Sequence, residues 1–81
     1  MPPNEYFTPE EARAKVGRRI RTDFAFSGVE RDTTGKVVGF YHHSPKQCGV
    51  EVQWDLLGRP VPLVDGFSKT EYQDFLVELE D

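Results

Sequence analysis

The sequence predicts a small, mainly β domain in which about four or five antiparallel strands curl into a barrel, with a short helix near each end. Two stretches carry most of this prediction. Residues 49–56 place an apolar side chain at every second position, as a half-buried strand does. Residues 68–79 carry an apolar stripe with helical spacing behind a capping residue. Because this helix follows the strands closely, we expect it to close the barrel.

A chain of 81 residues has room for one core, so residues 1–81 are expected to form a single domain. Its first part, residues 1–7, lacks an apolar pattern and is predicted to be a loose arm. The barrel is expected to span residues 17–67, and the C-terminal helix residues 68–79.

A short helix is predicted directly after the arm. Thr8 and Glu11 have the spacing of a capping box, and Pro9 occupies the first helical position. Gly17 is the expected stop. A helix of about two turns needs docking to persist, which we expect from the apolar side chains of Tyr6, Phe7 and Val16.

Two strands and a long loop follow the first helix. Residues 18–22 are predicted to form a strand with Ile20 inward, and residues 23–35 a loop that ends in a tight turn. Gly35 is expected to supply the positive φ of that turn. The next strand spans residues 36–43 and is rich in β-branched and aromatic side chains. Strict alternation along it places Val38 with Phe40 on one face and Val37 with Tyr41 on the other.

The third strand, residues 49–56, puts Trp54 on the inward face, so the indole is expected in the core and not in a ligand groove. Glycine and prolines in residues 58–62 interrupt the pattern, Leu63–Val64 is expected to add a short edge strand, and Asp65–Gly66 to form a turn. The final helix then has an inward stripe of Tyr72, Phe75, Leu76 and Leu79.

Composition narrows the classes of function. The net charge of −4 disfavours a general nucleic-acid binder, although residues 1–47 have a balance of +2 (eight basic, six acidic). The single Cys48 excludes an internal disulfide and a multi-cysteine metal site. Without a charged-then-apolar leader or a long apolar run, the chain is expected to be soluble and cytoplasmic, with no membrane partner.

The order of these strands, loops and turns resembles the SH3-like small β-barrels. Residues 26–29 (Phe-Ser-Gly-Val) and 33–38 (Thr-Thr-Gly-Lys-Val-Val) look like the entry into the second strand of KOW-type modules in ribosomal and transcription proteins. The chain is also similar to the small barrel proteins of ferredoxin-dependent complexes, namely the one in photosystem I and the variable chain of ferredoxin–thioredoxin reductase. From Gly17 to Leu79 it most resembles small uncharacterised bacterial proteins of this type, which share its Trp-Asp strand and terminal helix.

Candidate catalytic groups are few. His42 and His43 are adjacent on a predicted strand and therefore point to opposite faces, which disfavours a shared metal ion. Cys48 lies across a turn from them and could act as a nucleophile only if its pKa were depressed. Asp65 is interpreted as a turn residue, and Glu51 and Asp55 as solvated carboxylates. No catalytic set, metal or cofactor is predicted.

The expected function is that of a non-enzymatic protein-interaction or accessory module with an unknown protein partner. One alternative is a nucleic-acid or ribosome-associated module that uses the basic strip of residues 18–21. A further alternative is a small Cys/His enzyme or redox accessory. A mixed aromatic and basic surface is the expected interaction site; its residues are Phe24, Phe26, Arg19, Arg21, Arg31 and Tyr41.

Overall fold

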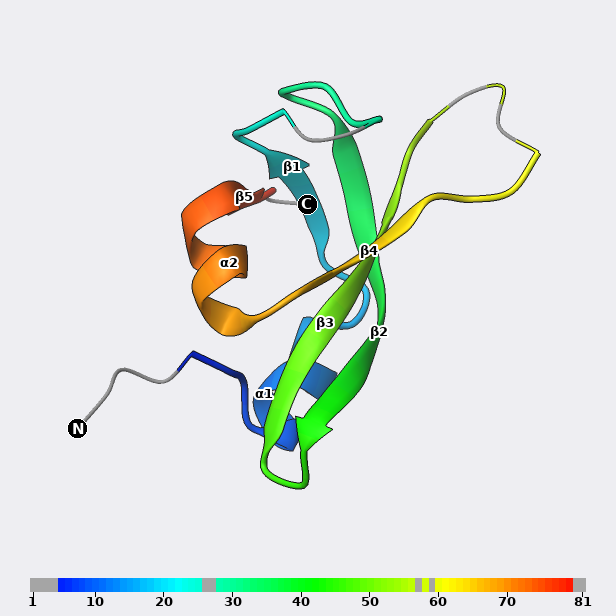
Figure 1. Cartoon of the computed structure of the whole chain (residues 1–81). Coiled ribbons are helices and arrows are strands. Elements are labelled where there is room, and N and C mark those ends of the chain that lie inside the picture. Colours follow the sequence, from blue (N-terminus) through cyan, green and yellow to red (C-terminus); the bar gives the residue numbers. More distant parts are fainter. Residues whose placement is uncertain (1–4, 26–27, 57, 59, 80–81) are drawn as a thin grey trace.

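A computed structural model describes residues 5–25, 28–56, 58 and 60–79. It has five antiparallel strands and two helices, which confirms the mainly β class and a helix towards each end (Figure 1). In chain order the elements are α1 (Pro9–Lys15), β1 (Arg19–Thr22), β2 (Thr34–Ser44), β3 (Gln47–Trp54), β4 (Val64–Phe67), α2 (Lys69–Phe75) and β5 (Leu76–Glu78).

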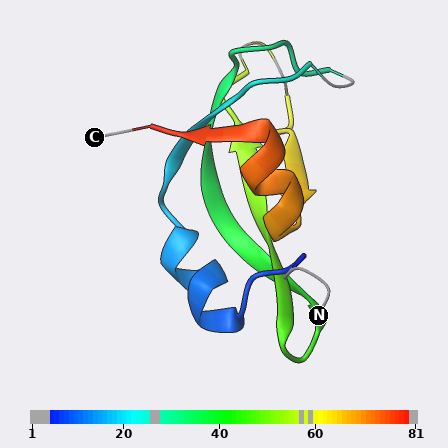
Figure 2. The same cartoon turned by 90° about the vertical axis from the view of Figure 1, so that its left-hand side faces the viewer.

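The strands form one open sheet in the order β4-β3-β2-β1-β5. The predicted barrel closure is wrong, because β4 and β5 lie at opposite edges and do not pair. Helix α2 lies between these two strands in the chain and contacts both of them. Both helices contribute side chains to one core, and Figures 1 and 2 show them against the sheet.

The core lies between the helices and the inner face of the sheet. Trp54 is 2% exposed, as predicted, and its indole N–H donates a 2.7 Å hydrogen bond to Asp65 Oδ2. Asp65 therefore has a structural partner inside the fold. The buried apolar residues of this core are Phe7, Ala12, Ile20, Val29, Val37, Cys48, Val50, Val52, Trp54, Phe67, Tyr72 and Leu76.

A register shift in β2 overturns the predicted assignment of its faces. The pairing with β3 runs from Val37 opposite Val52 to Gly39 opposite Glu51, so Val38 is an extra residue in the strand. Such a bulge reverses the alternation beyond it. Val37 is buried and Phe40 packs against the same core, whereas Val38 is 45% exposed.

Beyond the bulge, Tyr41 lies on the outer face of the sheet above two glycines. A Cβ atom built on Gly49 would lie 2.2 Å from Tyr41 Cζ, and one on Gly66 would lie 3.1 Å from Tyr41 Cε1. The absence of a side chain at both positions lets the ring cross β3 and β4. Burial raises the pKa of the Tyr41 hydroxyl, and the negative charges of Glu71 and Glu51 raise it further.

Several element boundaries differ from the prediction. Phe7, expected in a loose arm, is buried and bridges to Cys48 through two backbone hydrogen bonds of 2.9 and 2.7 Å. Gly17 has the positive φ of a helix stop, but Gly35 lies within β2, and Asp32 is the residue near that turn with a positive φ, 71°. Val16, expected to dock α1, is 42% exposed.

The C-terminal part also differs from the prediction. Asp65–Gly66, predicted as a turn, is the middle of β4, which pairs with β3 as far as Phe67. Helix α2 ends at Phe75, and residues 76–78 form β5 beside β1 instead of a last helical turn. The stripe still points inward at its centre, because Tyr72 and Leu76 are buried.

Both helices begin with a complete capping box, which predicts similar costs for removing either cap. Thr8 and Ser68 each accept a hydrogen bond from the backbone N–H three residues later. Thr8→Ala and Ser68→Ala should each lower the free energy of unfolding by about 1 kcal/mol. Urea denaturation checks this, with Thr70→Ala, on the exposed side of α2, as the control. Equal stability of wild type and both cap variants would contradict it.

Candidate functional site

Three residues of the predicted aromatic and basic surface lie on one face of the sheet. Arg19 and Arg21 lie on β1, where they share the outer face of the sheet with Tyr41. Their guanidinium groups are engaged locally. Arg19 Nη2 lies 2.7 Å from Asp55 Oδ2. Arg21 Nη1 lies 3.1 Å from Asp23 Oδ1 and also forms an ion pair with Asp32.

The remaining members of that prediction lie elsewhere. Phe24 is 49% exposed and packs edge-on against Phe75 of α2, with ring centroids 5.1 Å apart. It therefore lies beside the C-terminal end of α2. Arg31 is exposed in the loop before β2. Phe26 lies outside the described residues.

Cys48 lies opposite His42 in the β2–β3 ladder, but the two differ in exposure. The thiol of Cys48 is fully buried in the core, where a nucleophile would be out of reach of a substrate. His42 and His43 are exposed, and the His43 ring stacks on Tyr6 with centroids 4.5 Å apart. Within the described part of the chain, no three His, Cys, Asp or Glu residues are grouped to hold a metal ion.

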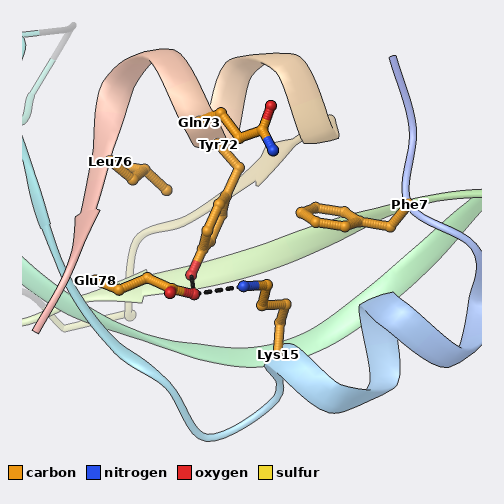
Figure 3. Close-up of a pocket in the computed structure, with 6 residues that line it drawn as sticks. All are labelled: Phe7, Lys15, Tyr72, Gln73, Leu76 and Glu78. Atoms are coloured by element: carbon orange, nitrogen blue, oxygen red, sulfur yellow. Dashed lines mark hydrogen bonds and ion pairs between the residues drawn. The ribbon is translucent and has the colours of Figure 1, made fainter. Parts of the chain in front are cut away.

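The structure instead contains a pocket of about 320 Å³ between the two helices and β5 (Figure 3). Its apolar walls come from Phe7, Tyr72 and Leu76, and the rings of Phe7 and Tyr72 meet edge to face at 5.6 Å. Gln73, Lys15 and Glu78 supply the polar groups. None of these side chains was predicted from the sequence to be functional.

A small polar network crosses the pocket. Lys15 Nζ lies 2.6 Å from Glu78 Oε2, and the Tyr72 hydroxyl donates a 2.8 Å hydrogen bond to the same oxygen. The Lys15 ammonium also lies 5.3 Å from the centroid of the Tyr72 ring, within the range of a cation–π contact. Figure 3 shows the three side chains converging from α1, α2 and β5.

The network shifts the pKa of two of its members away from neutrality. The hydrogen bond from Lys15 holds the pKa of Glu78 below its ordinary value, and the Tyr72 hydroxyl adds to the effect. Burial raises the pKa of Tyr72, and its hydrogen bond to Glu78 raises it further. The positive charge of Arg18 favours the ionised form of both groups. At neutral pH the carboxylate is therefore charged and the phenol is protonated.

The pocket is bordered by a free edge of the sheet. Leu79 donates its N–H to the Arg19 carbonyl at 2.9 Å, so alternation in an antiparallel ladder turns the backbone groups of Leu76 and Glu78 away from β1. The Leu76 N–H is bonded to the Tyr72 carbonyl. The outward groups of β5 are thus the Leu76 carbonyl and both backbone groups of Glu78, and no strand of the described chain pairs with them.

The network predicts a stability that depends on pH. Because the folded pKa of Glu78 lies below its ordinary value, its contribution to stability is complete above the unfolded pKa and is lost as the pH falls through the folded value. Glu78→Gln should therefore lower the urea midpoint at about pH 7, and the difference from wild type should shrink towards about pH 3. Glu30→Gln, in an exposed loop, is the control. A pH-independent difference for Glu78→Gln would contradict the prediction.

Comparison with known proteins leaves the site to be interpreted from its own geometry. No protein-family model, curated protein or solved structure matches the chain. No helix of the described residues is long and apolar enough to cross a membrane.

Proposed function

We propose that this protein is a non-enzymatic protein-interaction module that binds an extended segment of a partner along a free edge of its sheet. The observation that carries the proposal is the open sheet, whose edge strands β4 and β5 have no outer strand within the described residues. Unpaired backbone N–H and C=O groups at an edge are a ready template for another strand.

The two edges differ in how they are protected against strand addition. On β4, Trp54 N–H donates to the Leu63 carbonyl at 3.0 Å, so alternation turns Val64 and Gly66 outward. Pro60 and Pro62 precede this edge, and proline is a common device against strand addition. Residues 76–78 contain no proline, and β5 is protected instead by its length of three residues and by the inward-facing charge of Glu78.

The chemistry of the pocket favours binding over proton transfer. A general acid or base at neutral pH works best with a pKa near 7. The Glu78 and Tyr72 pKa values are both shifted away from that range. The buried Cys48 gives little support to the alternative of a Cys/His enzyme.

The nucleic-acid alternative has weaker support than strand addition. Phosphate binding requires basic side chains that are available to the ligand. Arg19 is paired with Asp55, and Arg21 with Asp23 and a second aspartate, so much of the predicted basic strip is neutralised within the protein. We therefore favour a protein partner.

Selection from a phage library of random dodecapeptides, followed by proline blocking of each edge, tests the proposal. Proline removes an outward N–H and is tolerated at an edge whose N–H faces solvent. Enriched peptides should bind at least about tenfold more weakly to Glu78→Pro than to Glu78→Ala, or to Val64→Pro than to Val64→Ala. A failure to enrich any peptide, or binding that neither proline affects, would refute the proposal.

A further inference from the structure

We infer that β5 is the edge that binds, that the adjacent pocket receives one apolar side chain of the bound segment, and that the basic rim favours an acidic residue beside it. This inference rests on the proposed function and specifies the edge and the ligand. Its basis is that Leu76 and Glu78 both line the pocket and both turn their backbone groups outward.

Because the pocket lies next to the outer edge of β5, it determines which side chains of a bound strand the protein would recognise. In an antiparallel or parallel pair, side chains of neighbouring strands at matched positions point to the same face. Leu76 and Glu78 point to the helical face of the sheet, where they line the pocket. A segment hydrogen-bonded to the outer edge of β5 would therefore direct alternate side chains towards that pocket, as in other cases of strand addition.

The walls of the pocket favour an apolar side chain. Phe7, Tyr72 and Leu76 present two aromatic rings and an aliphatic group to a space of about 320 Å³. This is room for a single large aliphatic or aromatic side chain, but not for a folded element. Burial of the apolar side chain of the bound segment is expected to be the main source of affinity in such a site.

Charges around the pocket favour an acidic neighbour. Lys15 is the last residue of α1, and Arg18 follows it by three residues. The positive charges of both side chains lower the pKa of Glu78. The Glu78 carboxylate already has Lys15 and the Tyr72 hydroxyl as partners. Since Lys15 is paired with Glu78, Arg18 is the basic side chain that remains to attract a carboxylate on the bound segment.

A second copy of this chain fits the site poorly. In a copy, Leu76 is buried in its own core and Glu78 is bonded to its own Lys15. These are the side chains that a paired β5 would direct towards the helical face, so neither is available to fill the neighbour's pocket. The occupant we propose is an extended segment of a different protein.

The test uses a labelled, unstructured heptapeptide with phenylalanine at its centre and glutamate on either side. Fluorescence anisotropy with the full chain should show binding that weakens about tenfold or more when serine replaces the central phenylalanine. Replacing the glutamates by lysines should weaken binding at low salt, and the difference should narrow as salt is raised. Arg18→Gln should reduce the preference for glutamate without changing the preference for phenylalanine.

Matched variants locate the peptide. Glu78→Ala and Glu78→Pro both remove the carboxylate, but only proline removes the outward N–H of β5. Binding should be at least about tenfold weaker in the proline variant than in the alanine variant, with circular dichroism confirming that both remain folded. Val64→Pro, at the opposite edge, should bind as wild type does.

Each other outcome overturns the inference in a recognisable way. If selected peptides bind but lose affinity only in Val64→Pro, the inference is wrong and the proposed function stands. The same holds if the central side chain of the heptapeptide has no effect. If sedimentation shows a dimer that Glu78→Pro converts to a monomer, the occupant of β5 is a second copy. If no extended peptide binds at either edge, the proposed function fails as well.

Discussion

Replacing Trp54 with alanine should lower the free energy of unfolding by about 3–5 kcal/mol, the range for deleting a buried large aromatic side chain. The indole is 2% exposed, lies edge-on to Phe67 with centroids 6.1 Å apart, and donates its N–H to Asp65. Alanine would leave a cavity in the core and deprive the partly buried Asp65 of a donor. Urea denaturation at neutral pH measures the loss.

Two controls separate these contributions. Trp54→Phe keeps an aromatic ring but removes the N–H, so it should cost less than alanine. Asp65→Asn retains a side-chain oxygen that can accept the indole hydrogen bond, so it should cost less than either Trp54 variant. An alanine variant as stable as the phenylalanine variant would show that the indole is not a central part of the core.

Gly35→Ala should destabilise the protein by about 1–3 kcal/mol through overpacking. A Cβ atom at this position would lie 2.8 Å from the Gln53 carbonyl oxygen and 3.0 Å from both Trp54 Cε3 and Val52 Cγ1. The closest of these atoms belongs to the backbone of β3, which cannot move aside without disturbing the hydrogen-bonded ladder. The position requires glycine for close approach, not for a positive φ.

Gly39→Ala in the same strand is the matched control. Its nearest neighbour is Glu51 Oε1 at 3.3 Å, the far end of a flexible side chain. Alanine there also restricts the unfolded chain, so the change should be within about 1 kcal/mol of wild type in either direction. Equal losses of stability for Gly35→Ala and Gly39→Ala would contradict the close-approach argument.

Local sequence patterns predicted the helices and strands of this fold, but not whether the sheet closes into a barrel. The alternation around Trp54 and the capping boxes at Thr8 and Ser68 depend on neighbours in the chain, and the structure confirms them. The open sheet depends on where β4 and β5 lie relative to each other. A short stretch of sequence does not show how two distant strands are placed relative to each other.

The bulge at Val38 is the clearest case of tertiary context overriding a pattern. Residues 36–43 alternate well enough to suggest two regular faces, but one extra residue reverses the faces beyond it. The assignment of Tyr41 to the face of Val37 is therefore wrong. A glycine within a strand sequence can indicate an irregularity, but it does not show on which face the following side chains lie.

The pocket could not have been predicted from spacing. Lys15 and Glu78 are near opposite ends of the sequence, and in a sequence each looks like an ordinary exposed charge on a helix. Tyr72 and Leu76 were correctly expected to face the core as members of a helical stripe. That α2 stops at Phe75 and gives way to β5 is what brings Glu78 to the Tyr72 hydroxyl.

The pairing of β1 with β5 has a consequence for how the protein is made. Residues 76–78 emerge from the ribosome long after β1, yet they form one side of its ladder. Until they arrive, β1 can pair only with β2, and its other backbone groups face solvent. Contacts so distant in sequence also close slowly. The nascent chain therefore passes through a stage in which the free edge of the sheet is β1 instead of β5, and unpaired edges of this kind favour aggregation.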